Sequence, residues 1–410
     1  MTIGGAIFVL PGVLASSVGA GAPLVLVLGA LVFIPIALCF SAAGSRISAS
    51  GGLYRYVRAA FGPFCGFLIG AIFWISNAAA SGGMAAALLD QMALIWPMLR
   101  YPVPRAFMIL SAFSVLYALN ARGIRAGAVA GIVLATIKLL PLFLLAALGC
   151  FHLHGANLRW PAHFDWSAVG SAMVLVVFAY SGLENALAPS GEIHDPSKVV
   201  PLATLTAIAT VVALYVGLQM VAQGALGGAL AGHPAPLAAL TEVIVPGAYD
   251  VLLVVAAISM FGTLQGDLVG SSRLIYALAQ DGYLPHALSK VSVTHRVPAL
   301  ALAAHAAAVS LLTILGSFRG LALMAGGAFC LVYLGCCAAA WQLQHLDVRE
   351  HGAPFVLRGG PAIPLIACSI LILILATLAR VEWQAIGLAM AFVMVLAGVA
   401  RWRRAALESA

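Results

Sequence analysis

The sequence predicts an all-α polytopic membrane protein with about twelve transmembrane helices. Composition is the first observation, since 63% of the 410 residues are hydrophobic and only 8% are charged. The second is that the apolar residues form successive runs long enough to cross a bilayer. The expected spans are residues 2–16, 23–43, 63–95, 104–120, 127–150, 167–190 (interrupted), 198–222, 250–279, 297–316, 320–343, 362–379 and 384–402.

The basic residues sort onto alternate loops, and this orients the chain. If the segment after residue 43 is cytoplasmic, most lysines and arginines fall on that side, while the other side holds only Arg100, Arg105, Arg159, Arg319 and Arg380. Cytoplasmic loops are enriched in basic residues, so we expect a cytoplasmic C-terminus, with a bacterial inner membrane as the location. The net charge of +7 therefore reflects membrane orientation, and no nucleic-acid partner is expected.

The cysteines and acidic residues do not form a pattern typical of a metal or catalytic site. The seven cysteines lie mostly within apolar runs, without paired spacing or neighbouring histidines. Neither paired aspartates nor a serine and histidine set occurs at a shared helical depth. We therefore expect no metal and no cofactor, and an intramembrane enzyme is the least favoured class.

Lys138 is the most informative single residue. It lies in the apolar run 127–150, where a cation costs about 2.5–3.5 kcal/mol on insertion scales and normally faces a protein interior or a water-filled cavity. The alternative is a lysine whose long stem lets its ammonium group reach the headgroups.

Two predicted spans carry helix breaks. Near the N-terminus, Gly4 and Gly5 interrupt the first span, and the remaining stretch is only about 22 Å long, too short for about 30 Å of hydrocarbon. The sixth span carries Ser181, Gly182 and Pro189 where apolar residues are expected. Interrupted segments at positions one and six indicate a five-plus-five inverted repeat, the architecture of transporters that bind substrate near the bilayer midplane.

Broken helices expose backbone groups that can bind a ligand. Free N–H groups and the positive dipole end at Gly4, Gly5 and Ala6 suit a carboxylate. Carbonyl groups released at Phe178, Ala179, Ser181 and the adjoining Gly182 suit an ammonium group. An α-amino acid carries both charges a short distance apart, so the paired breaks predict a zwitterionic ligand.

Several stretches, taken together and in order, resemble the amino acid-polyamine-organocation superfamily of secondary transporters over nearly the whole chain. The matching stretches are residues 3–12 (IGGAIFVLPG), 50–63 (SGGLYRYVRAAFGP), 119–127 (LNARGIRAG), 138–142 (KLLPL), 178–184 (FAYSGLE), 191–201 (GEIHDPSKVVP) and 272–285 (SRLIYALAQDGYLP).

The resemblance implies a leucine-transporter-type fold and gives roles to individual positions. Gly4, Gly5 and Ala6 would hold the substrate carboxylate, and the Phe178 ring would cover the substrate as an aromatic gate. Asn77 falls where related exchangers place a polar side chain toward the substrate. In some proton-coupled relatives, a lysine that matches Lys138 occupies the place where other members of the fold bind a sodium ion. Thr263 would be a nearby polar partner of this lysine.

Two acidic residues are candidates for gating or selectivity. Glu184, just beyond the sixth-span break, can bind substrate, sense protons or cap the following half-helix. Asp267 would select cationic side chains if it faces the cavity unpaired, whereas pairing with Lys138 or another donor would carry no information about substrate. We favour the paired alternative, because an unpaired buried charge is costly.

The expected organisation is a transport core in residues 1–343, followed by two transmembrane helices and a short cytoplasmic tail in residues 344–410. The resemblance also implies a half-helix before the Gly-Gly break, and an upstream start is the favoured explanation for its absence before Met1. The leading hypothesis is secondary active transport of amino acids by alternating access with proton symport, with substrate, protons and membrane lipid as partners. Alternatives are an amino acid/amine exchanger, and a non-transporting sensor or accessory subunit.

Overall fold

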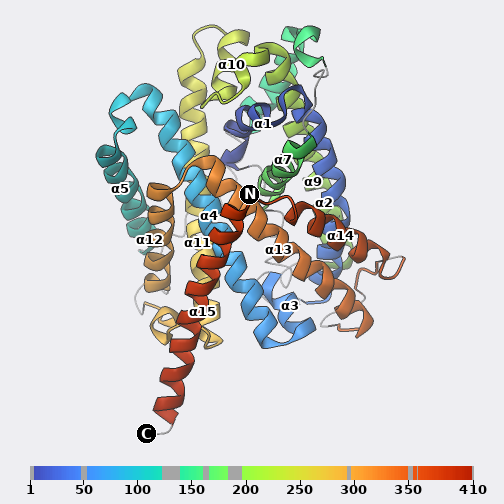
Figure 1. The fold of residues 1–410 in the computed structure, drawn as a ribbon, viewed down its shortest axis with the longest axis vertical. Coiled ribbons are helices and arrows are strands. Elements are labelled where there is room, and N and C mark those ends of the chain that lie inside the picture. Colours follow the sequence, from blue (N-terminus) through green and yellow to red (C-terminus); the bar gives the residue numbers. More distant parts are fainter. Residues whose placement is uncertain are drawn as a thin grey trace.

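The computed structural model describes residues 4–47, 53–121, 139–159, 166–182, 196–292, 297–349, 354–357 and 359–408, and within these ranges it is helical without strands (Figure 1). The longer elements are α1 (Leu10–Val18), α2 (Ala22–Gly44), α3 (Leu53–Phe61), α4 (Pro63–Ile95), α5 (Pro102–Ala121), α7 (Trp166–Tyr180), α9 (Pro196–Leu226), α10 (Pro236–Ile244), α11 (Tyr249–Gln280), α12 (Ala299–Leu315), α13 (Phe318–His345), α14 (Ala362–Leu375) and α15 (Arg380–Glu408). Short 3₁₀ turns include η1 (Gly5–Phe8), η7 (Gly227–Leu230) and η8 (His286–Ser289).

The helices confirm the prediction of a polytopic membrane protein. Among the described residues, seven helical segments are long and apolar enough to cross a membrane, and the first of them, Leu10–Gly44, contains both α1 and α2. Shorter apolar helices at Leu139–His152, Ala168–Tyr180, Ala299–Leu315 and Ala362–Leu375 follow the remaining predicted spans. Most boundaries match the hydropathy pattern closely, because the polar and proline-containing segments between apolar runs end the helices.

Two short helices lie outside the predicted spans. The first, α3, has the buried side chains Leu53, Tyr54, Tyr56 and Val57 on one face, while Arg55 and Arg58 are only partly buried. The second, α10, lies in the glycine-, alanine- and proline-rich segment 223–246, where Pro236 starts a helix. The two helices lie at opposite ends of the molecule (Figure 1).

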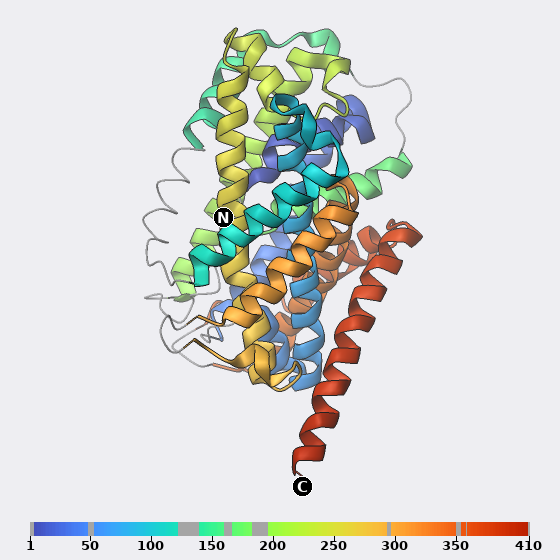
Figure 2. The ribbon, with the colours of Figure 1, turned by 90° about the vertical axis from the view of Figure 1, so that its left-hand side faces the viewer.

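The core is centred on α13, which packs against α4, α2, α7, α3 and α14. In its most apolar window 78% of residues are buried, compared with 17% for α5 and for α15. The two exposed helices lie at the edge of the bundle, and α15 runs beyond its lower end in both views (Figures 1 and 2). Apolar side chains on these outer helices suit contact with lipid.

Small residues allow α7 to pack closely between its neighbours. A Cβ atom at Gly29 of α2 would overlap the side chain of Val176, and one at Gly326 of α13 would overlap the backbone and side chain of Val174. Small residues at helix interfaces let backbones approach closely within a membrane. Tyr180 adds a hydrogen bond, its hydroxyl donating to the carbonyl oxygen of Leu26 at 2.9 Å.

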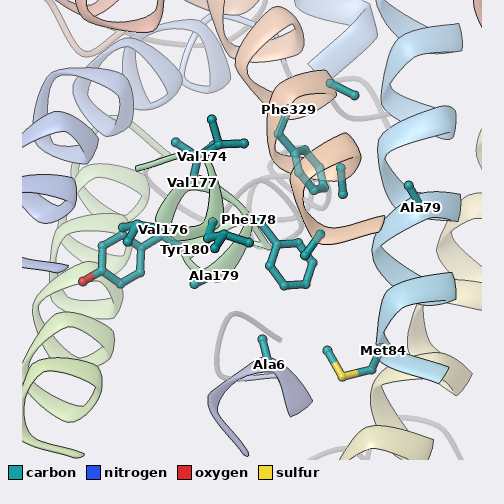
Figure 3. Close-up of a cluster of buried hydrophobic side chains, with 14 of the residues drawn as sticks. Ala6, Ala79, Met84, Val174, Val176, Val177, Phe178, Ala179, Tyr180 and Phe329 are labelled. Carbon is teal, nitrogen blue, oxygen red and sulfur yellow. The ribbon is translucent and has the colours of Figure 1, made fainter. Parts of the chain in front are cut away.

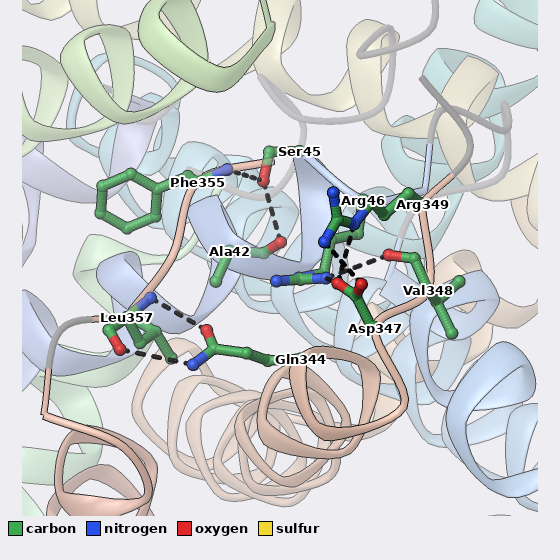
Figure 4. A network of polar contacts seen from close by, with 9 residues as sticks. All are labelled: Ala42, Ser45, Arg46, Gln344, Asp347, Val348, Arg349, Phe355 and Leu357. Atoms are coloured by element: carbon green, nitrogen blue, oxygen red, sulfur yellow. Dashed lines mark hydrogen bonds and ion pairs between the residues drawn. The ribbon is translucent and has the colours of Figure 1, made fainter. Parts of the chain in front are cut away.

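Polar contacts join three chain segments at the end of α2 (Figure 4). The guanidinium of Arg46, 2% exposed, donates to the carbonyl of Val348 at 3.1 Å and forms an ion pair of 3.5 Å with Asp347. The backbone N–H of Phe355 donates to the Ser45 hydroxyl, and Gln344 exchanges two hydrogen bonds with the backbone of Leu357. The segment 354–357 is thereby attached to both α2 and α13.

Candidate functional site

The first membrane segment is irregular near the N-terminus, but the residue that separates its two helical pieces is Val9, not the predicted Gly4 and Gly5. Gly4 is extended, Gly5 to Phe8 form η1, and Val9, with φ −123° and ψ −35°, separates η1 from α1. The leading N–H groups of a helix have no partner within it. The backbone around Gly5 and Ala6 therefore has the donors that the carboxylate hypothesis requires.

Gly5 sits where two helices leave room for backbone only. A Cβ atom at this position would lie 2.5 Å from Met260 Cγ of α11, 2.6 Å from Met84 Sδ of α4 and 3.0 Å from Met260 Cα. Any other residue would require the flexible methionine side chains to move and would also press on the backbone of α11. Glycine is thus required by close packing at this position, which brings η1 directly against α4 and α11.

The helical part of the predicted sixth segment, α7, ends where the break was predicted to begin. The helix stops at Tyr180, and Gly182 has φ +103°, a left-handed value that favours glycine. The carbonyl of Phe178 accepts from the Ser181 hydroxyl at 2.7 Å and from its N–H at 3.3 Å. In this conformation the Phe178 carbonyl is therefore already used by its own segment. Residues 183–195, with Glu184, lie outside the described ranges.

The two interruptions share one buried cluster (Figure 3). The Phe178 ring projects from α7 toward α4, with Ala6 of η1 and Met84 of α4 in the same cluster. It also contacts Phe318 edge to face, with 6.0 Å between ring centroids. The backbone positions predicted to bind the two charges of a zwitterion thus lie beside an aromatic and methionine surface.

The segment 227–244, with η7 and α10, packs against α1. The Gln91 amide nitrogen donates to the carbonyls of Phe8 and Pro234, at 3.3 and 3.2 Å, and Gln219 donates to Pro11 at 3.3 Å. Further along, the N–H of Gly232 donates to the carbonyl of Gly12 at 3.0 Å. The first segment is therefore held to segment 227–244 by the Gly232 bond, and to α4 and α9 by the two glutamine amides.

Asp267, on α11, is paired. Its carboxylate accepts from the hydroxyls of Ser81 at 2.6 Å and Ser271 at 2.9 Å, and its Oδ2 lies 2.9 Å from His305 Nε2 of α12. The donors come from α4, α11 and α12, and Asp267 is 21% exposed. In the structure, Asp267 is thus hydrogen-bonded to side chains of the protein itself. Its part in gating or selectivity stays a prediction.

The remaining predicted residues are distributed as follows. Asn77 is half-buried on α4, one turn before Ser81 and on the same face. Thr263 is half-buried on α11, one turn before Asp267, and its hydroxyl donates to the Ser259 carbonyl at 2.9 Å. Lys138 lies outside the described ranges, so its pairing with Thr263 and its coupling role stay predictions.

Sequence reasoning missed several of the polar residues just described. Gln91, Gln219 and His305 are nearly fully buried in apolar helices, and a polar residue within a membrane segment is itself a signal of structural or functional importance. That signal identifies the residues but not their partners, because Gln91 and Pro234, for example, are separated by 143 positions.

Comparison with known proteins gives a consistent family result. The family described as amino acid permease matches residues 1–400. The chain is 28% identical to the uncharacterized amino acid permease YecA of Bacillus subtilis over 287 residues, 68% of this chain and 63% of that protein. It is 28% identical to a polyamine transporter of Oryza sativa over 66% of this chain and 52% of that protein. It is 25% identical to the branched-chain amino acid permease BcaP of Bacillus subtilis over 73% of this chain and 68% of that protein. The chain thus spans less than two thirds of the length of YecA.

Proposed function

We propose, because this chain belongs to the amino acid permease family, that it is a secondary transporter that moves an amino acid or amine across a membrane by alternating access. The observation that carries the proposal is that the interrupted first and sixth segments share one buried cluster. Family membership supplies the class of protein, and the cluster supplies a location for the substrate.

The chemistry of the two breaks favours a substrate with both a carboxylate and an amino group. A carboxylate at the start of η1 would meet the unpaired N–H groups near Gly5 and Ala6, an interaction worth about 0.3–1 kcal/mol for an exposed charge and up to about 2 kcal/mol when partly buried. Carbonyl groups at Ala179 and Ser181 would accept from the amino group. The Phe178 carbonyl can join them only if Ser181 releases it.

Proton coupling is the second part of the proposal. Lys138 would carry the proton and, when charged, would tether the first and eighth membrane segments through groups such as Thr263. Desolvation makes such a switch possible, because burial disfavours the charged form of a lysine. The membrane potential supplies enough free energy for uphill accumulation of substrate, since one elementary charge crossing about 100 mV releases about 2.3 kcal/mol.

The orientation follows from the charges. Arg46 and Arg58 lie at one end of the bundle, where Arg58 forms an ion pair with Asp281 at the end of α11 and Arg46 pairs with Asp347 beyond α13. We assign this end, and the C-terminus, to the cytoplasm of a bacterial cell, with the protein in the inner membrane. Residues 227–244 would then face outward and cover the substrate path.

Uptake into liposomes tests the proposal. Purified protein is reconstituted, and uptake of radiolabelled alanine, leucine, arginine and putrescine is measured with and without an inward proton gradient, using protein-free liposomes as the control. We expect saturable uptake of at least one amino acid, increased by the gradient. Uptake that needs internal substrate and ignores the gradient would favour an amino acid/amine exchanger. Absence of uptake for all four labelled compounds would favour a sensor or accessory subunit.

A further inference from the structure

We propose that Asp267 is a proton-binding site, and that Trp74 keeps the adjoining His305 neutral so that the proton binds to the carboxylate and not to the imidazole. The site lies deep in the bundle, because Asp267 is about 27 Å from the start of α11 and about 20 Å from its end at about 1.5 Å per residue. This inference builds on the proposed transport function by adding a second proton site, distinct from Lys138.

The hydrogen bonds define the protonation state of His305. The indole Nε1–H of Trp74 donates to His305 Nδ1 at 3.1 Å, and an indole N–H can only donate. Nδ1 must therefore be unprotonated, so Nε2 carries the hydrogen and donates to Asp267 Oδ2 at 2.9 Å. A second proton on the imidazole would place two N–H groups against each other and break the bond to Trp74.

The same bonds describe an ionised carboxylate. Oδ2 accepts from His305 and from the Ser81 hydroxyl, and Oδ1 accepts from the Ser271 hydroxyl. Hydrogen bonds to the charged form stabilise it, and a single negative charge in a membrane segment is unusual enough to indicate a function. With His305 neutral, the Trp74, His305 and Asp267 group carries one negative charge.

Proton binding needs one rearrangement, and the structure provides for it. A proton added to Asp267 Oδ1 becomes a donor to Ser271 Oγ, which changes from donor to acceptor. The Ser271 hydroxyl hydrogen can then turn to the main-chain carbonyl four residues earlier, which belongs to Asp267, a bond that serine commonly makes in helices. Oδ2 keeps both of its donors. The group changes from a charge of −1 to zero, with no other proton transferred.

The position of Asp267 links this charge to the substrate cluster. Asp267 and Met260 are seven residues apart and share a face of α11, and Met260 lies against Gly5. The proton site is therefore about 10 Å along α11 from its contact with η1. A change in charge at Asp267 can alter the packing of α11 against the interrupted segment without any substrate contact of its own.

Other titratable groups on the surrounding elements do not occupy this role in the described part of the chain. Asp90 pairs with Arg105, and Glu242 accepts from the backbone of Gly247 and Tyr249. Arg273 is exposed, six residues beyond Asp267 and on another face of α11. The remaining titratable side chains on α4, α5, α11 and η8 are Cys65, Tyr117, Tyr249, Asp250, Tyr276 and His286.

Infrared spectroscopy tests proton binding directly. Difference spectra of the purified protein between high and low pH should contain a protonated-carboxyl band that Asp267→Asn lacks and that Asp90→Asn, the control on α4, retains. If the difference spectrum of Asp267→Asn contains the same bands as that of the wild type, the proposal is overturned. This measurement requires no transport substrate.

Substitutions at His305 separate the two possible proton carriers. Glutamine has an N–H donor for Asp267 and a carbonyl acceptor for Trp74 but cannot be protonated, so His305→Gln should keep proton-driven accumulation, whereas His305→Ala should reduce it. Asp267→Asn should lower the accumulation ratio about fifty-fold at about 100 mV, the effect of losing one coupled charge, while substrate exchange persists. Loss of proton coupling in a folded His305→Gln variant would assign the proton to His305 and overturn the proposal.

Trp74→Phe tests the positioning role. Removing the indole N–H leaves Nδ1 of His305 free to accept a proton. The pH profile of uptake should therefore gain an ionisation from His305. The Trp74→Phe/His305→Gln double variant should lack this ionisation. A profile identical to wild type would remove Trp74 from the mechanism. If wild-type protein takes up none of the labelled amino acids, the proposed transport function fails, and the infrared band still decides whether Asp267 binds a proton.

Discussion

The amide nitrogen of Gln91 donates to the carbonyl oxygen of Phe8 at 3.3 Å, and this contact joins α4 to the interruption in the first membrane segment. The same nitrogen donates to Pro234 at 3.2 Å, so one buried side chain connects the first membrane segment to segment 227–244. Phe8 is the last residue of η1 and lies just before Val9, whose φ of −123° separates η1 from α1. Gln91 thus bonds a carbonyl group at the junction of η1 and α1.

Gln91→Leu should destabilise the protein. The substitution keeps the size of the side chain but leaves two carbonyl oxygens without their donor, and an unsatisfied buried polar group costs about 1–3 kcal/mol. Thermal unfolding in detergent measures the change, with Gln280→Leu, at an exposed position, as the control. Equal unfolding temperatures for wild type and Gln91→Leu would show that these bonds contribute nothing to stability.

Gly5→Ala should be poorly tolerated. The new Cβ would lie 2.5 Å from Met260 Cγ and 2.6 Å from Met84 Sδ, and overpacking of this kind costs about 1–3 kcal/mol. Adding Met84→Ala should recover part of the loss, because the Met260 backbone still presses on the site. Gly228→Ala is the matched control, since nothing lies within 4 Å of its added atom. Both stability and uptake are measured, and an unaffected Gly5→Ala variant would contradict the close packing.

Lys138→Ala should weaken the pH dependence of uptake, leaving only the part due to Asp267, while apparent substrate affinity stays largely unchanged. The reason is the proposed coupling role, in which the ammonium group tethers helices without contacting substrate. Uptake is measured across a pH series, with Lys290→Ala, at an exposed position near η8, as the control. Full proton-driven accumulation by Lys138→Ala would remove this lysine from the coupling mechanism.

Asp347 should make stability depend on pH in the acidic range. The hydrogen bond from Arg349, with a smaller contribution from Arg46, lowers the pKa of the Asp347 carboxyl below its ordinary value of 3.8. A carboxyl whose pKa is lower when folded stabilises the fold above the unfolded pKa, and this contribution is lost as pH falls through the folded pKa. Asp347→Asn should therefore reduce the drop in unfolding temperature between about pH 5 and about pH 3.

Arg349→Gln provides the complementary variant, because Arg349 is the main cause of the lowered pKa. It should reduce the same acid sensitivity, although by a small amount, since both side chains are largely exposed. An acid response identical in wild type and both variants would assign it to other groups.

The helices could be predicted because membrane spans depend on local composition. The predicted span 63–95 coincides with α4, and 250–279 differs from α11 by a single residue at each end. Hydropathy could not reveal α3 or α10, since each is nine residues long. The end of α7 before Ser181 and Gly182 was predictable for a similar reason, because glycine and serine in an apolar run interrupt a helix locally.

The polar contacts of the bundle could not be predicted in the same way. Trp74 and His305 are 231 positions apart, and nothing in the local sequence of either residue identifies the other. Asp267 was recognised as a charged residue that needs a partner, but the identity of the partner depends on how α4, α11 and α12 pack. The use of the Phe178 carbonyl by Ser181 likewise depends on the conformation of the helix end.

The close fit of Val176 at Gly29 has a mechanical consequence for transport. Because the valine fills the space where a side chain would otherwise stand, α7 cannot slide along α2 without first separating from it. The hydroxyl of Tyr180, bonded to Leu26, strengthens the same junction. Opening toward either face of the membrane should consequently move α2 and α7 together as one rigid unit, with the hinge at Ser181 and Gly182.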